Sequence, residues 1–204
     1  MDQILSIAKT KQVIVSVVVW MGLMVSVSLA AEISGVQFSE FYQNQGIRMS
    51  LQGTGLKTML FFKAFVAGYY TNLPNAADPL GEFSKRIEVE YFVNIPGKKL
   101  NNYTIEQMKA NISEEMFQSL SAQIKLMGEY FVDLKKGDRF ALTYIPGRGT
   151  EFSHNGRVTG VIPGLAFAKA LFSVWIGEKP FDPQLKEQIY GAAHSLKSEE
   201  RVIS

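Results

Sequence analysis

The sequence predicts an α+β domain in which a large antiparallel sheet carries its helices on one face. Strand patterns fall into two groups, at 47–70 with 87–93 and at 140–161, and one helical pattern lies between them. Two further helical segments follow, over 163–177 and 182–190. This order lacks the regular alternation of strand and helix that a parallel sheet requires, so it favours antiparallel pairing.

The amino-terminal segment has the layout of a secretory signal peptide. Lys9 and Lys11 precede an apolar run over 13–29, and the small residues Ala30 and Ala31 follow it. We expect cleavage after Ala30 or Ala31, which gives a signal peptide over 1–31 and a domain over 32–204 in the periplasm of a bacterium or secreted from it. A retained membrane anchor is the alternative, because a spanning helix needs only about 20 apolar residues.

Charge and composition exclude several classes of function. The chain of 204 residues has a formal net charge of +2 and no cysteine. Disulfides, thiol catalysis and cysteine metal sites are therefore excluded. The near-neutral balance, without a basic patch that includes aromatic residues, gives no support for a nucleic-acid partner or for strong attraction to an anionic membrane surface.

Two strands joined through a bend are predicted over 47–70. Gly53 and Gly55 lie between them, and such glycines permit a bend or the close approach of another backbone. In the second strand, over 59–70, both alternating sets are apolar, which predicts a central strand covered on both faces. The loop that follows has room for a short helix up to Phe83. The strand over 87–93 then places Glu88 and Glu90 on a wetter, solvated face.

One long helix is predicted from Thr104, as its N-cap, to Gly128. Apolar residues three or four apart form a stripe along it, and the methionines Met108, Met116 and Met127 of this stripe are expected to pack in the core. The strands that follow over 140–144, 152–154 and 157–161 are joined by turns, and Asn155 with the next glycine is a strong hairpin signal.

The two terminal helices are defined by their ends. Pro163 suits the first turn of the first helix, and Gly177 is expected to end it as a left-handed C-terminal cap. Asp182 as N-cap and Pro183 in the first turn begin the second helix.

Motifs for catalysis and for metal binding are missing from the sequence. His154 and His194 have no partner at metal-ligand spacing, and no nucleophile elbow or phosphate-binding glycine loop is present. We expect no metal site and no cofactor. An apolar cavity between the strand over 59–70 and the long helix is the remaining candidate site. The polar groups that can fix one end of a ligand there are Lys57, Lys63, Tyr69 and Tyr103, and the simpler interpretation makes them solvated lysines and core tyrosines.

Several segments together resemble the bacterial chalcone isomerase-like proteins. They are GTGLKTMLFFKAFVAGYY at 53–70, the glycine and lysine at 97–98, the Lys-Gly-Asp turn at 136–138 and LFSVWIGEKPFDPQLKEQI at 171–189. The resemblance covers most of the chain after the apolar run. It implies an open-faced β-sandwich, a large antiparallel sheet with helices packed on one face.

The resemblance also implies which residues line the site. Plant isomerases of this family close a flavanone ring with an arginine, a threonine and a tyrosine. In this sequence Lys57 stands at the arginine position, Phe65 near the threonine and Leu100 near the tyrosine, while Val174 and Trp175 match a pocket pair. Lysine lacks the two parallel donors of arginine, and the other two side chains have no polar group, so we do not expect chalcone cyclisation.

Non-catalytic members of this fold bind fatty acids, and the resemblance implies that role here. Lys57 would pair with a carboxylate while apolar side chains take the tail. The expected ligand-binding residues are Lys57, Phe65, Tyr69, Tyr103, Val174 and Trp175. Two alternatives stay open: an exported interaction or structural domain that binds no ligand, and an isomerase or intramolecular lyase with an altered substrate. No membrane span is expected after signal cleavage.

Overall fold

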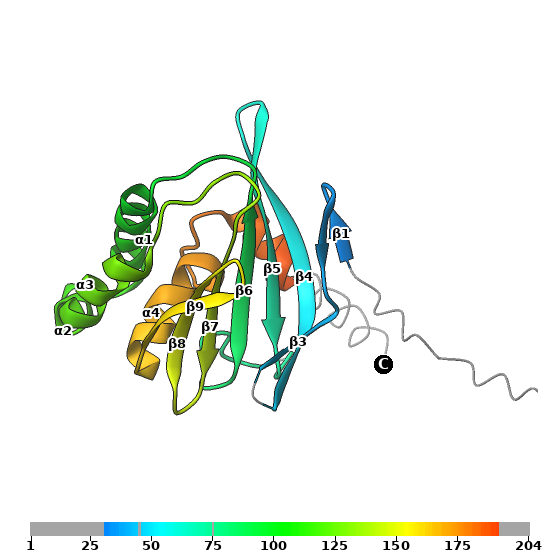
Figure 1. The fold of residues 1–204 in the computed structure, drawn as a ribbon. Coiled ribbons are helices and arrows are strands. Elements are labelled where there is room, and N and C mark those ends of the chain that lie inside the picture. Colours follow the sequence, from blue (N-terminus) through cyan, green and yellow to red (C-terminus); the bar gives the residue numbers. More distant parts are fainter. Residues whose placement is uncertain (1–30, 45, 75, 192–204) are drawn as a thin grey trace, which may run out of the picture.

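A seven-stranded antiparallel sheet forms the centre of the fold (Figure 1). The computed structural model describes residues 31–44, 46–74 and 76–191. Each strand lies beside its neighbours in sequence, which confirms the predicted antiparallel meander. The strands are β3 (Phe41–Asn44), β4 (Ile47–Met59), β5 (Phe62–Thr71), β6 (Lys85–Tyr91), β7 (Arg139–Ile145), β8 (Gly149–His154) and β9 (Arg157–Ile162).

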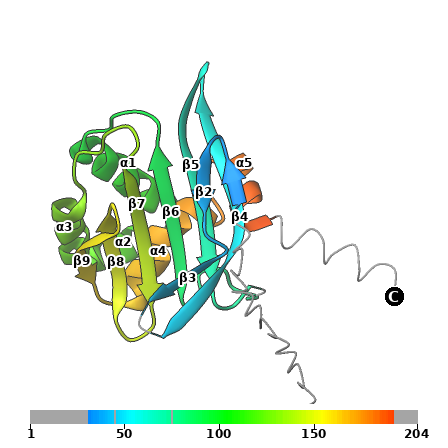
Figure 2. The same cartoon turned by 45° about the vertical axis from the view of Figure 1, so that its right-hand side comes forward.

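Helices cover one face of this sheet, as the sequence predicts, and Figure 2 shows the same layering from a second direction. Helix α4 contacts β8 on one side and α1 on the other, and the last helical segments lie against β4 and β5. The helices are α1 (Gly97–Asn111), α2 (Glu114–Ser119), α3 (Ser121–Tyr130), α4 (Leu165–Ile176), α5 (Pro183–Lys186) and the π-helix η1 (Glu187–Gly191). The predicted signal peptide over 1–31 lies outside the described residues apart from its last residue.

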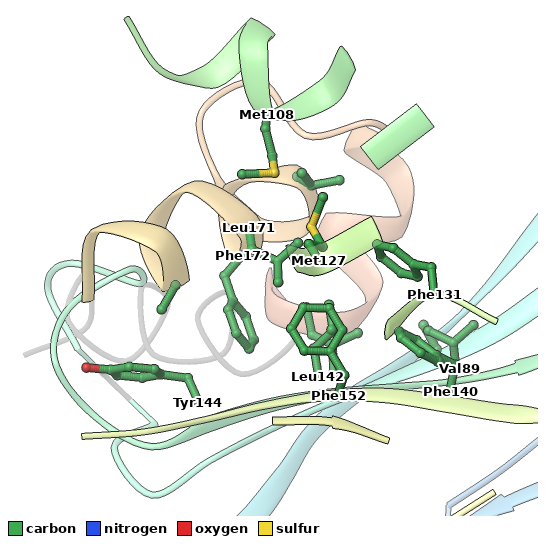
Figure 3. Packing of buried hydrophobic residues seen from close by; sticks show 14 of the residues in the cluster. Val89, Met108, Met127, Phe131, Phe140, Leu142, Tyr144, Phe152, Leu171 and Phe172 are labelled. Carbon is green, nitrogen blue, oxygen red and sulfur yellow. The ribbon is translucent and has the colours of Figure 1, made fainter. Parts of the chain in front are cut away.

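The core between sheet and helices is apolar and closely packed. Met108 on α1 and Met127 on α3 are fully buried, as the helical stripe predicts. Figure 3 shows them on the helix side of the core, with Leu171 on α4 near them and Leu142 and Phe152 pointing up from the sheet. Strand β5 is buried from Ala64 to its end, so the prediction of a strand covered on both faces is confirmed for this part.

The opposite face of the sheet is covered in part by a small hairpin of β1 (Ala31–Ile33) and β2 (Val36–Phe38). Phe38 is fully buried in a second cluster with residues of β4 and β5. Glu88 and Glu90 lie on this face, where Arg139 binds both carboxylates at 2.8 Å. The expectation that these two glutamates are solvated is therefore wrong, because ion pairs and the hairpin half-bury them.

The prediction of one long helix from Thr104 is wrong, because three helices occupy this stretch. The first already begins at Gly97, so Thr104 lies inside α1, where its hydroxyl donates to the Leu100 carbonyl. Ser113 starts a new helix, since its side-chain oxygen accepts the N–H of Met116 as an N-cap. The break leaves Met116 41% exposed on α2 instead of in the core. Gly128 does not end α3, which continues to Tyr130.

The terminal helices form where the sequence predicts them, with different ends. Pro163 precedes the first turn of α4 instead of lying in it. Gly177 ends α4 with φ −72°, so its cap is not left-handed. A glycine is still required there, because a Cβ would lie 2.5 Å from the Ser173 carbonyl oxygen. Asp182 caps α5 by accepting the N–H of Leu185, as predicted.

Gly53 and Gly55 do not divide two strands, and the predicted bend is wrong in that respect. Strand β4 runs through both glycines to Met59. The predicted close approach of another backbone is confirmed, since a Cβ on Gly53 would lie 2.4 Å from the carbonyl oxygen of Gln188. At Gly55 a Cβ would lie 2.6 Å from the Leu185 side chain. The glycines therefore let α5 and η1 sit directly on β4.

Replacing Gly53 by alanine tests this contact. The added methyl group meets backbone that cannot rotate away, so we expect Gly53→Ala to lower the free energy of unfolding by about 1–3 kcal/mol, as overpacking does. Thr54→Ala, at the next residue of the strand, is the control and should cost less. Chemical denaturation measures both, and equal losses would contradict the proposed close contact.

Lys85 is a buried amine on the helix-covered side of the fold. The loop before it forms turns and bends instead of the short helix expected up to Phe83. The Lys85 ammonium group donates to the carbonyl of Gly81 at 2.6 Å and lies 4.0 Å from the Phe83 ring. Burial lowers the pKa of Lys85 to about 7; Asp78 opposes the shift and Lys169 adds to it.

Because Lys85 is buried, the free energy of unfolding should depend on pH. Between about pH 7 and the usual lysine pKa of about 10.4, the unfolded chain holds a proton that the folded chain has released. The free energy of unfolding should therefore rise with pH across this window, by at most about 1.4 kcal/mol per pH unit. Subtracting the values for Lys85→Met isolates this rise from other titrating groups. Two parallel pH curves for parent and variant would contradict the assignment.

Candidate functional site

Four aromatic rings from separate parts of the chain meet where β5, α1 and α4 come together. The Trp175 ring lies edge-on to Phe181, with ring centroids 5.0 Å apart. Phe65 on β5 lies 6.0 Å from Trp175, and Tyr103 on α1 lies 6.2 Å from Phe181. Edge-to-face contacts at these separations stabilise the cluster beyond simple burial.

Lys57 supplies a positive charge beside this aromatic cluster. It lies on β4 directly opposite Phe65 in the sheet register. Its Nζ binds Oδ2 of Asp182 at 2.5 Å, while Oδ1 of Asp182 accepts the N–H of Leu185. Burial alone would raise the pKa of Asp182, but the bonds from Lys57 and from Leu185 outweigh it and lower the pKa. The carboxylate is therefore ionised and held at the lysine.

Tyr103 forms the outer rim of the cluster, with 48% of its surface exposed. Burial of its inner part raises the pKa of the phenol, Lys57 lowers it and Asp182 raises it again. The phenol is neutral at physiological pH as a result, so it can donate or accept a hydrogen bond but cannot act as a charged base.

An apolar cavity adjoins the cluster between the sheet and the α1–α4 pair. Its volume is about 20 Å³. Its lining is apolar apart from the hydroxyls of Thr104 and Tyr91, and consists of Ile87, Val89, Tyr91, Leu100, Thr104, Phe131, Phe140, Leu142, Leu171 and Trp175. This space holds about one water molecule. An acyl chain enters only if side chains at the rim move.

The structure brings together four of the six residues expected to bind a ligand: Lys57, Phe65, Tyr103 and Trp175. Val174 is buried with 3% exposure and does not line the cavity, although its carbonyl accepts the N–H of Phe181 and so positions that ring.

Tyr69 lies in a different place on the same sheet. Its ring packs 5.7 Å from Tyr190, beside a smaller hollow of about 10 Å³. Its hydroxyl is buried close to the Thr71 hydroxyl, without a hydrogen bond of good geometry. The Thr71 hydroxyl beside it already donates to Ser84 and accepts from Leu73. Tyr69 is therefore separate from the cluster around Lys57.

Sequence reasoning missed Phe181 and the second role of Asp182. The sequence identifies Asp182 as an N-cap, and that local signal is correct. Its ion pair with Lys57 spans 125 positions, so no local pattern reports it. Phe181 follows a proline in the short connection between α4 and α5. No helix or strand periodicity exists there to indicate which side chains are buried.

The described part of the chain contains no group of three or more His, Cys, Asp or Glu residues that could hold a metal ion. His154 has an acidic neighbour in space, Asp138 at 3.1 Å, which directly precedes β7 and was not evident from spacing. None of the described helices is long and apolar enough to cross a bilayer.

Two substitutions of Asp182 separate its roles in stability. Asparagine caps a helix as well as aspartate does, so Asp182→Asn removes only the ion pair with Lys57. That pair is partly solvated, because the lysine side chain is 30% exposed. We expect a loss of about 0.5–1 kcal/mol in the free energy of unfolding. Asp182→Ala also removes the cap and should cost about 1 kcal/mol more. Equal losses, measured by chemical denaturation, would contradict the capping role.

Comparisons with known proteins agree with this architecture. A model described as chalcone isomerase-like matches residues 30–191. Among solved structures, a fatty-acid binding protein of Arabidopsis thaliana is similar in fold, with a TM-score of 0.63 and 17% sequence identity, over 82% of this chain and 98% of that chain. A comparison with curated protein sequences found no match.

Proposed function

The chain belongs to the chalcone isomerase-like family, and from this premise we propose that it binds a small apolar ligand with a carboxylate, such as a fatty acid, without catalysis. The ligand tail lies between the sheet and helices α1 and α4, and its carboxylate lies at Lys57. The observation that carries the proposal is a lysine opposite Phe65, beside a cluster of aromatic rings whose Trp175 also lines an apolar cavity.

Asp182 indicates how a carboxylate would be held. Its own carboxylate already pairs with Lys57, so the position suits the chemistry of a fatty-acid head group. An ammonium group has three donors. A ligand carboxylate therefore either shares Lys57 with Asp182 or displaces the Asp182 oxygen that binds Lys57. Asp182 stays in place in both cases, because its other oxygen caps α5.

The tail requires the cavity to widen. Trp175 and Leu100 are both partly exposed and both line the cavity, so they form its outer boundary. Rotation of these two side chains extends the cavity to the surface between α1 and α4. The similar fold of a fatty-acid binding protein supports this mode of binding.

The lining of the cavity argues against catalysis. Thr104 uses its hydroxyl proton on the Leu100 carbonyl. Burial raises the pKa of Tyr91, so its phenol stays neutral. Lys57 offers a point charge and not the paired donors of a guanidinium. These groups bind and orient a ligand but supply no general base near a reacting carbon.

We also propose that the protein is exported, to the periplasm or to the medium. The basis is the sequence of the amino-terminal segment, in which an apolar run over 13–29 ends in small residues.

A second candidate function is an interaction domain with a filled core and no ligand. The small volume of the cavity favours it, since about 20 Å³ leaves no room for a tail without movement. Ligand binding, measured directly, separates the two candidates.

The proposed function predicts a preference for acids that depends on Lys57. The parent protein should bind a long-chain fatty acid about tenfold or more tightly than the alcohol of equal length, because a charge-assisted hydrogen bond is lost with the alcohol. In Lys57→Met the ratio of the affinity for the acid to that for the alcohol should fall to about one, while the affinity for the alcohol stays unchanged. Displacement of a fluorescent acyl probe measures each affinity.

Two further variants make the result specific. Lys169→Met removes an exposed lysine on α4 that pairs with Asp78, and it should leave the preference intact. Asp182→Asn removes the competing carboxylate and should tighten binding of the acid alone. A preference that survives in Lys57→Met would overturn the role of that lysine. No binding of either compound by the parent would favour the filled-core domain.

A further inference from the structure

The hairpin between β4 and β5 ends in an apolar surface that no other described part of the protein covers. We call residues 59–62 the hydrophobic tip. Figures 1 and 2 both show this hairpin projecting beyond the loops that surround it. The exposed fractions are 52% for Met59, 88% for Leu60, 99% for Phe61 and 49% for Phe62. The sequence predicts these residues as part of a covered strand, and the structure shows that this is wrong.

The conformation of the tip indicates that its residues do not serve the stability of the fold. Leu60 and Phe61 form the two-residue loop between the strands. Leu60 has φ 52°, in the left-handed region that glycine enters without strain. A leucine there is strained and also almost fully exposed, so the turn itself would favour another residue. Such an outlier points to function.

Exposed lysines collect at the same end of the sheet. The Phe92 N–H donates to the Ala64 carbonyl, which joins the base of the tip to the segment after β6. Asn94 lies in that segment, and its side-chain oxygen accepts the N–H of Lys136, which joins the segment to the turn before β7. The exposed lysines on these adjoining segments are Lys63, Lys98, Lys99, Lys135 and Lys136.

Few carboxylates oppose these lysines on the same segments. Asp133 accepts the N–H of Gly97 at 2.8 Å, and Asp138 accepts from the Lys135 N–H and the Asn155 side chain. The near-neutral composition gave no reason to expect an anionic partner, but the fold brings lysines that are distant in sequence to one end.

We propose that the hydrophobic tip inserts into the headgroup layer of a lipid membrane and that the lysines around it face anionic headgroups. A lipid surface fits the tip because it accepts a small, convex apolar projection flanked by cations. A stable protein interface buries about 800 Å² on each partner, and four residues at a hairpin end do not provide such an area. This inference does not depend on the proposed fatty-acid ligand.

A fluorescent label at the tip tests the proposal in the full chain. Because the sequence has no cysteine, Phe61→Cys takes a single environment-sensitive label. Vesicles of equal parts phosphatidylcholine and phosphatidylglycerol should raise and blue-shift its emission. Vesicles of phosphatidylcholine alone should require about tenfold more lipid for the same change. The label reports the tip itself, so lipid binding by the amino-terminal apolar segment does not produce the signal.

Two further variants serve as controls. Leu73 is 51% exposed and follows β5 at its opposite end, so a label at Leu73→Cys should not respond to vesicles. Adding Leu60→Gly to the labelled protein relieves the strained turn and keeps the fold. It should raise about fivefold the lipid concentration at which the emission change is half complete.

Three results would overturn the proposal. They are no response at position 61, an equal response from the label at position 73, and a response at position 61 that is indifferent both to vesicle charge and to Leu60→Gly. Self-association of the unlabelled protein without vesicles, lost in Leu60→Gly, would instead assign the tip to a second copy of the chain.

Discussion

The packing of α4 between the sheet and α1 is the interaction on which the rest of the structure depends. Eight of its residues are buried, on all sides of the helix, so it can exist only inside the core. Its carboxyl end sets the course of the chain after Gly177, which brings Phe181 against Trp175 and Asp182 to Lys57. The glycines of β4 then allow α5 and η1 to close over the strand. The candidate site is thus a consequence of how α4 ends.

The parts of the fold that follow from local patterns could be predicted from the sequence. Alternating residues and turn signals define the strands, and the N-cap at Asp182 is read correctly because its partner, the Leu185 N–H, is three residues away. The break at Ser113 was missed because apolar spacing continues across it, and a stripe of side chains does not show where a backbone changes direction.

Non-local features could not be predicted in the same way. The pairing of Lys57 with Asp182 depends on how β4 and α5 are placed by the whole core. The exposure of Leu60 and Phe61 was missed for a related reason, since apolar residues in a strand pattern indicate a core unless the strand extends beyond the body of the sheet. The grouping of lysines at one end likewise depends on tertiary structure, because a net charge near zero does not exclude a local excess.

The proposed ligand site and the proposed membrane contact lie near the same end of the β4–β5 hairpin. Phe65 lies close to the tip along β5 and takes part in the aromatic cluster, so a ligand at Lys57 and a membrane at Phe61 would be neighbours. The central claim is the position of the ligand, and nuclear Overhauser effects between a bound fatty acid and the protein report it most directly. The account predicts contacts from the chain methylenes to Leu100, Leu171 and Trp175. Contacts confined to Leu60 and Phe61, with none to the cavity, would contradict it.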